Sequence, residues 1–117
     1  MMEQFEIQPV EESQSEMLNG RAPQVLVIED EAALLEGVLE ILKIENYDVM
    51  GASNGLDGVR LAREHLPYII VCDIMMPGLD GYAVLRELRA EPVTASIPFI
   101  FLTAKASRGD LRQGMEL

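Results

Sequence analysis

Apolar and polar positions follow two alternating patterns from residue 23 to the end of the chain. Four short runs are almost wholly apolar and rich in strand-forming residues, which predicts buried strands at residues 24–28, 48–52, 68–72 and 97–102. Between them, apolar residues recur every three or four positions, which predicts amphipathic helices at about 32–45, 55–65 and 82–90, and the start of a fourth at 107–117. This βαβαβαβα order is typical of an α/β fold in which helices cover both faces of a parallel sheet.

The helix spacing also predicts which residues face the core and where one helix begins. In the helix over 55–65, Leu56, Val59 and Ala62 fall on the predicted inner face. Asp80 has the short polar side chain that caps helix N-termini, so we expect the third helix to begin just after it.

Composition excludes several classes of partner. The net charge is −11 at pH 7, so the chain lacks the basic patch that nucleic-acid binding needs. No apolar run approaches the ~20 residues of a membrane-spanning helix, and we expect no membrane contact. The chain has one cysteine, Cys72, which lies in an apolar run. A lone core cysteine fits a reducing compartment, and we expect a cytoplasmic protein.

Residues 1–22 differ in composition from the rest of the chain. They are rich in Glu, Gln and Ser and have no helical or alternating apolar period. We therefore predict a disordered acidic tail over 1–22 and one folded domain over 23–117.

Polar residues stand at the predicted carboxyl ends of three strands. Glu29 and Asp30 follow the first strand, Asp73 follows the third, and Thr103 follows the fourth. In open parallel sheets the site lies at this edge. If the first and third strands are neighbours, three carboxylates meet there, and Mg²⁺ would relieve their repulsion. An exposed Asp73 beside that ion would be suited to attack phosphorus, with Thr103 donating to a phosphoryl oxygen.

Each of these residues also has a plainer interpretation. Glu29 and Asp30 could serve as negative charges at the start of the following helix. Thr103 could be an ordinary hydroxyl at the end of a strand. Their joint placement at strand ends in one topology favours a site.

Three stretches carry a resemblance to a known family. VLVIEDE (25–31), VCDIMMPGLDGYAVLRELR (71–89) and IPFIFLTAKAS (97–107) closely resemble the receiver domain of bacterial two-component response regulators. The resemblance implies a flavodoxin-like fold with strand order 2-1-3-4-5. It also implies a phosphoprotein of phosphorelay signal transduction that takes its phosphoryl group from a histidine kinase or phosphotransfer protein.

Carried over by position, the resemblance gives roles to the residues at the strand ends. Asp73 resembles the phosphoacceptor, and Thr103 resembles the switch hydroxyl. Glu29, Asp30 and Asp73, with the backbone carbonyl of Met75, resemble the Mg²⁺ ligands. The implied activity is that of a switch that alters contacts with a downstream protein, so we do not expect an enzyme.

The resemblance ends before the family's fifth strand, its Lys-Pro motif and its fifth helix. Lys105 lies too close to Thr103 to be the family's lysine. We therefore expect a truncated receiver with strand order 2-1-3-4, which another chain could complete as a dimer or by strand swapping. Without the later lysine, a pseudo-receiver that binds partners without phosphorylation is the alternative.

Two other functions on similar sheets fit the residues less well. Phosphatases with an Asp nucleophile usually have a second Asp two residues later, and Met75 stands there instead. Flavin binding needs a phosphate-cradling loop after the first strand, whereas EDEAALLEG (29–37) would repel a phosphate.

Overall fold

The computed structural model describes residues 21–102. Most of the predicted tail over 1–22, Thr103, Lys105 and the helix predicted from residue 107 lie outside the described residues. The elements in chain order are β1 (Gln24–Ile28), α2 (Ala32–Ile44), β2 (Asp48–Ala52), α3 (Gly55–His65), β3 (Ile69–Asp73), α4 (Gly81–Arg89) and β4 (Phe99–Leu102). Among these helices, none has the length and apolar character to cross a bilayer.

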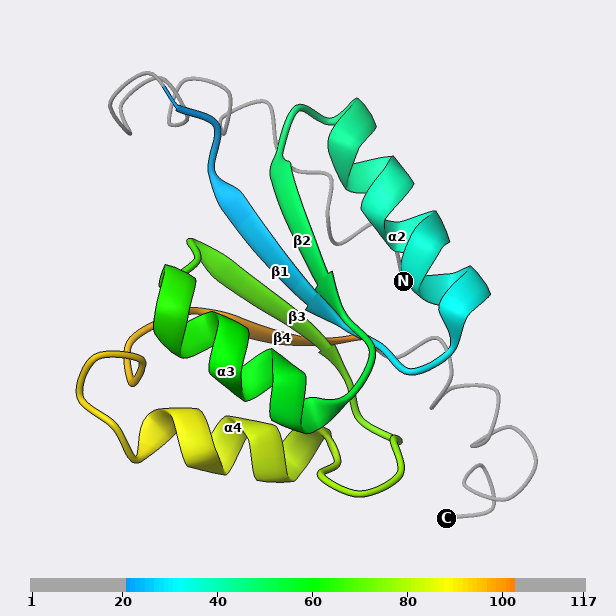
Figure 1. Ribbon diagram of the computed structural model, residues 1–117. Coiled ribbons are helices and arrows are strands. Elements are labelled where there is room, and N and C mark those ends of the chain that lie inside the picture. The colour runs from blue at the N-terminus through cyan, green and yellow to red at the C-terminus, as the bar shows by residue number, and fades with distance from the viewer. Residues whose placement is uncertain (1–20, 103–117) are drawn as a thin grey trace, which may run out of the picture.

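The four strands form one parallel sheet in the order β2-β1-β3-β4 (Figure 1). This order confirms the predicted flavodoxin-like arrangement. β3 begins one residue later than its apolar run predicts. It also ends one residue later, because Asp73 still pairs with Leu102 of β4. β4 begins at Phe99 rather than at Ile97, since Pro98 has no N–H for the strand ladder.

Helices cover both faces of the sheet (Figure 1). The residues of the strands divide between two core clusters, one on each face. Leu26 and Ile28 of β1 pack with α3 and α4 on one face. Val25 and Val27 pack with α2 on the other. Because both faces are buried, β1 reads as a continuous apolar run rather than an alternating one.

One prediction about the core was wrong. Leu56, expected to face inward, has 72% of its surface exposed, whereas Val59 and Ala62 are buried as predicted. Gly58 lies on the buried face instead, where an added Cβ would sit 2.5 Å from Cδ1 of Ile28. The missing side chain lets α3 lie close to β1 and turns its buried stripe away from Leu56.

Side chains fix the starts of α3 and α4. Asn54 accepts a hydrogen bond from the N–H of Asp57 at 2.8 Å. Asp80 accepts one from the N–H of Ala83 at 2.9 Å, which confirms its predicted capping role. Both capped ends lie at the carboxyl edge of the sheet, since each helix follows the end of a parallel strand.

Candidate functional site

β1 and β3 are neighbours, so their carboxyl ends lie side by side. Their pairing aligns Ile28 with Cys72. One position further, Glu29 follows β1 and Asp73 ends β3. After β1 the chain forms β2 on one side of β1 and then returns to form β3 on the other side. The strand order therefore switches direction between β1 and β3. Ligands bind at such switch points in open α/β sheets.

Three carboxylates come together at this edge, as the sequence predicts. Glu29, Asp30 and Asp73 each offer a carboxylate oxygen, and these oxygens lie within 4.8 Å of one another. All donors are charged oxygens, which are the ligands of hard cations such as Mg²⁺. The chemistry of the donor set therefore fits the predicted ion, while the role of each residue stays a prediction.

The structure corrects the expected exposure of Asp73. We expected a carboxylate open to solvent, but the residue is fully buried, as is Glu29, and Asp30 is half-buried. β3 continues through Asp73, whose backbone pairs with Leu102 of β4. The candidate nucleophile is therefore held by the sheet rather than by a flexible loop.

Glu29 also shapes the start of α2. Its Oε2 accepts a hydrogen bond from the N–H of Glu31, the residue just before α2, at 2.8 Å. The carboxylate of Glu29 therefore lies near the start of α2 as well as in the acidic cluster. A negative charge is favoured there because the N–H groups of a first turn point toward it.

The loop over 74–80 leads from Asp73 to α4. Gly78 has φ +77, a conformation that favours glycine and lets the chain turn back. Met76 is buried, whereas Met75 has 61% of its surface exposed. Coordination of the ion by the backbone carbonyl of Met75 stays a prediction.

Cys72 lies under the site as a core residue. Burial, with smaller contributions from the nearby carboxylates of Asp73, Glu29 and Asp80, raises the pKa of its thiol to about 12. Its Sγ lies 3.3 Å from the carbonyl oxygen of Asp73, to which it donates. A buried neutral thiol is a poor nucleophile, so Cys72 is inert in the folded chain.

Two glycines at this edge were not predicted to belong to the site. The sequence indicates turns at Asn54-Gly55 and Asp80-Gly81, but each glycine is the first residue of a helix and is buried. The signal that could have found them is the repeated pair of a capping residue followed by glycine, just before a helical period.

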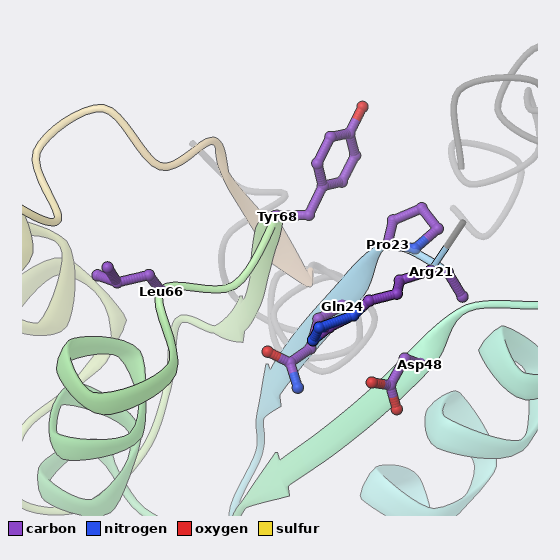
Figure 2. A pocket seen from close by; sticks show the side chains of 7 residues that line it. Arg21, Pro23, Gln24, Asp48, Leu66 and Tyr68 are labelled. Carbon is purple, nitrogen blue, oxygen red and sulfur yellow. The ribbon is translucent and has the colours of Figure 1, made fainter. Parts of the chain in front are cut away.

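A hollow of about 590 Å³ lies at the opposite, amino end of the sheet (Figure 2). Its charged residues, Arg21 and Asp48, have opposite signs. In Figure 2 the side chains of Leu66 and Tyr68 point in different directions rather than toward a common centre. Size alone therefore does not make it a second candidate site.

Comparison with known proteins identifies the family. The family model for the response regulator receiver domain matches residues 25–117. The chain belongs to this family. The sequence of the receiver is 40% identical over 93 residues to Response regulator PleD of Caulobacter vibrioides, covering 80% of this chain and 20% of that protein. It is 34% identical over 87 residues to Protein PilH of Pseudomonas aeruginosa, covering 74% and 72%.

Solved structures agree with the family. The receiver domain of sensor histidine kinase PA1611 from Pseudomonas aeruginosa, solved with a magnesium ion in its active-site cleft, is 30% identical. It superposes with a TM-score of 0.70 over 81% of this chain and 78% of its own. A receiver domain of a histidine kinase from Syntrophus aciditrophicus is 33% identical, with a TM-score of 0.68 over 81% and 72%.

The receiver spans only a part of several relatives. It covers 20% of PleD and 38% of the probable transcriptional regulator ycf27 of Porphyridium aerugineum. What such a longer protein does as a whole is a separate matter from what this domain does.

Proposed function

We propose that this receiver accepts a phosphoryl group on Asp73 and acts as a signalling switch rather than as an enzyme. The convergence of Glu29, Asp30 and Asp73 within 4.8 Å carries the proposal. An acidic cluster at a switch point suits chemistry in which a cation brings an anionic phosphoryl group to a carboxylate.

In the proposed reaction, a carboxylate oxygen of Asp73 attacks phosphorus. The new O–P bond forms as the bond from phosphorus to the donor breaks, and the donor leaves with that electron pair. For a phosphohistidine donor the leaving atom is an imidazole nitrogen. The product is an aspartyl phosphate, which places new negative charge at the carboxyl edge of the sheet, at the end of β3.

Mg²⁺ would be held by Glu29, Asp30, Asp73 and the carbonyl of Met75, and would neutralise charge on the phosphoryl oxygens. Support for the ion comes from the donor set and from the PA1611 receiver domain, which was solved with magnesium in its cleft. Glu29 would also link the site to the start of α2, because its Oε2 accepts a hydrogen bond from the N–H of Glu31.

The proposed partners follow from the family. A histidine kinase or phosphotransfer protein would supply the phosphoryl group, and a downstream protein would respond to it. Thr103 would be the hydroxyl that responds to phosphorylation. The pseudo-receiver alternative is less favoured, because the full acidic set is present and brought together.

Intact mass spectrometry tests the proposal. The full chain, incubated with acetyl phosphate and Mg²⁺, should gain the mass of one phosphoryl group, and Asp73→Asn should gain none. Asp48→Asn is the matched control, because Asp48 lies exposed at the other end of the sheet. It should gain the same mass as the unaltered chain. A folded chain that gains no mass would rule out phosphoryl acceptance and favour the pseudo-receiver.

A further inference from the structure

Helices α3 and α4 begin with glycines that touch the loop between β3 and α4. A Cβ at Gly81 would lie 2.4 Å from the carbonyl oxygen of Asp73 and 2.8 Å from Cα of Ile74. Both are backbone atoms, which cannot rotate away as a side chain can. The N–H of Gly81 also donates to the carbonyl of Ile74 at 2.9 Å. Gly81 therefore closes the start of the loop against the backbone of Asp73.

Gly55 makes the equivalent contact at the far end of the loop. A Cβ there would lie 2.4 Å from the carbonyl oxygen of Leu79 and 2.8 Å from its Cβ. The first residues of α4 and α3, which are both glycines, thus contact the two ends of the loop. The caps Asn54 and Asp80 fix those helix starts in turn.

We propose that Gly55 and Gly81 are positioning residues for the metal site. The loop they hold (residues 74–80) follows Asp73 and contains Met75, and Gly81 contacts the backbone of Asp73 itself. Displacing these backbone atoms would move the Asp73 carboxylate and the Met75 carbonyl relative to Glu29 and Asp30. Mg²⁺ requires a near-ideal octahedron with ligands at about 2.0–2.1 Å. A methyl group at either glycine cannot fit until the backbone moves, and that movement displaces ligands. This inference rests on the proposed Mg²⁺ site.

Two other glycines supply matched controls. The three atoms nearest to a Cβ at Gly58 all belong to the side chain of Ile28, the closest being Cδ1 at 2.5 Å, so Gly58→Ala disturbs the core rather than the loop backbone. A Cβ at Gly37, within α2, would meet nothing within 4 Å. The four alanine variants therefore distinguish three effects on Mg²⁺ binding: displacement of the loop, a general loss of stability, and the replacement of glycine by alanine as such.

The experiment measures Mg²⁺ affinity by titration calorimetry and stability by urea unfolding, on the full chain and the four variants. Gly81→Ala and Gly55→Ala should weaken Mg²⁺ binding roughly tenfold or more, as changes around metal ligands do. Gly58→Ala should lower stability while Mg²⁺ affinity stays unchanged. Gly37→Ala should change neither.

The outcomes distinguish this inference from the proposed function. If the full chain binds Mg²⁺ and folded Gly81→Ala and Gly55→Ala bind it equally well, the positioning role is wrong and the metal site stands. If Gly58→Ala weakens binding as much as they do, general destabilisation explains the effect and the positioning role is again wrong. A folded parent chain that binds no Mg²⁺ overturns both. Should Gly81→Ala fail to fold, Gly55→Ala decides, because its methyl meets Leu79 and not Asp73.

Discussion

The two ends of the same sheet differ in what they bring together. The amino end has a hollow of about 590 Å³ whose charges, Arg21 and Asp48, have opposite signs. The carboxyl end gathers the carboxylates of Glu29, Asp30 and Asp73 within 4.8 Å. Bringing like charges together costs free energy unless a bound cation or a reaction requires them there. A surface hollow costs little free energy. Convergent charge is therefore the better guide to the site.

Helix direction explains why the charges gather at one end. In a βαβ unit each helix starts near the carboxyl end of the preceding strand, so α2, α3 and α4 point their N-termini at that edge, where N–H groups favour acidic side chains. The amino end receives the helix C-termini. There the chain turns through Asn46 and Leu66, both with positive φ.

The largest expected effect concerns thiol labelling. Cys72 should react with an alkylating reagent at pH 8 roughly a hundredfold or more slowly than in urea, because labelling of a buried thiol requires opening of the structure. An Asp48→Cys, Cys72→Ala variant, with its thiol at the amino end, should label at nearly the unfolded rate. Equal rates at the two ends in the folded chain would contradict the burial described here.

The same thiol predicts a pH dependence. Its pKa is about 12 in the folded chain against a usual 9.0, so the folded state holds the proton more tightly. The resulting stabilisation is complete below pH 9 and is lost as the pH rises from 9 toward 12. Urea unfolding of Cys72→Ala across this range should show a flatter decline than the unaltered chain does.

Removing acidic charge at the carboxyl end should weaken Mg²⁺ binding. Glu29→Gln and Asp30→Asn should each raise the Kd for Mg²⁺ roughly tenfold or more, because each removes a charged oxygen from the cluster. Asp48→Asn removes the same charge from the amino end and should leave the Kd unchanged. Equal weakening by all three would mean that overall charge, and not the cluster, attracts the ion.

Removing a helix cap at the carboxyl edge should have a moderate effect on stability. Asp80→Ala deletes the acceptor for the N–H of Ala83 and should lower the free energy of unfolding by about 1 kcal/mol. Glu36→Ala, on the exposed side of α2, is the control and should change it little. Urea unfolding measures both, and a neutral Asp80→Ala would show that the cap contributes nothing.

The smallest effect is expected at the amino end. Leu66 ends α3 with φ 47 and ψ 63, a conformation that costs most side chains energy but that Asn adopts readily. Because half of its surface is exposed, Leu66→Asn should raise the free energy of unfolding by up to about 1 kcal/mol. A loss of stability would mean that the leucine side chain packs better than its exposure indicates.

Among the described residues, the apolar pattern predicted the strands, the helices and their order well, because the central strands β1 and β3 are buried on both faces and each helix on one. The meeting of Glu29, Asp30 and Asp73 was predictable from topology alone. The burial of Asp73 was not, because the exposure of a side chain at a strand end depends on the segments that pack around it. That is a tertiary contact, which local pattern does not encode.

The errors in α3 and α4 have a common cause. Periodicity counts apolar side chains, so it placed Leu56 inward and gave no weight to Gly55, Gly58 or Gly81. Yet an added Cβ at any of these three glycines would come within 2.5 Å of a neighbouring segment. Hydrophobic periodicity is based on the burial of apolar side chains, so it does not detect contacts that depend on a residue having no side chain.

The glycine at the start of α4 has a consequence for protein engineering. In a chimeric receiver that takes its α4 from another protein, one option is to exchange the helix from its capping residue onward. Here Asp80 and Gly81 belong functionally to the loop beneath them, because Gly81 rests on the backbone of Asp73. A graft of α4 should therefore begin at Tyr82. The donor sequence then changes the outer surface and leaves the contact between Gly81 and the backbone of Asp73 intact.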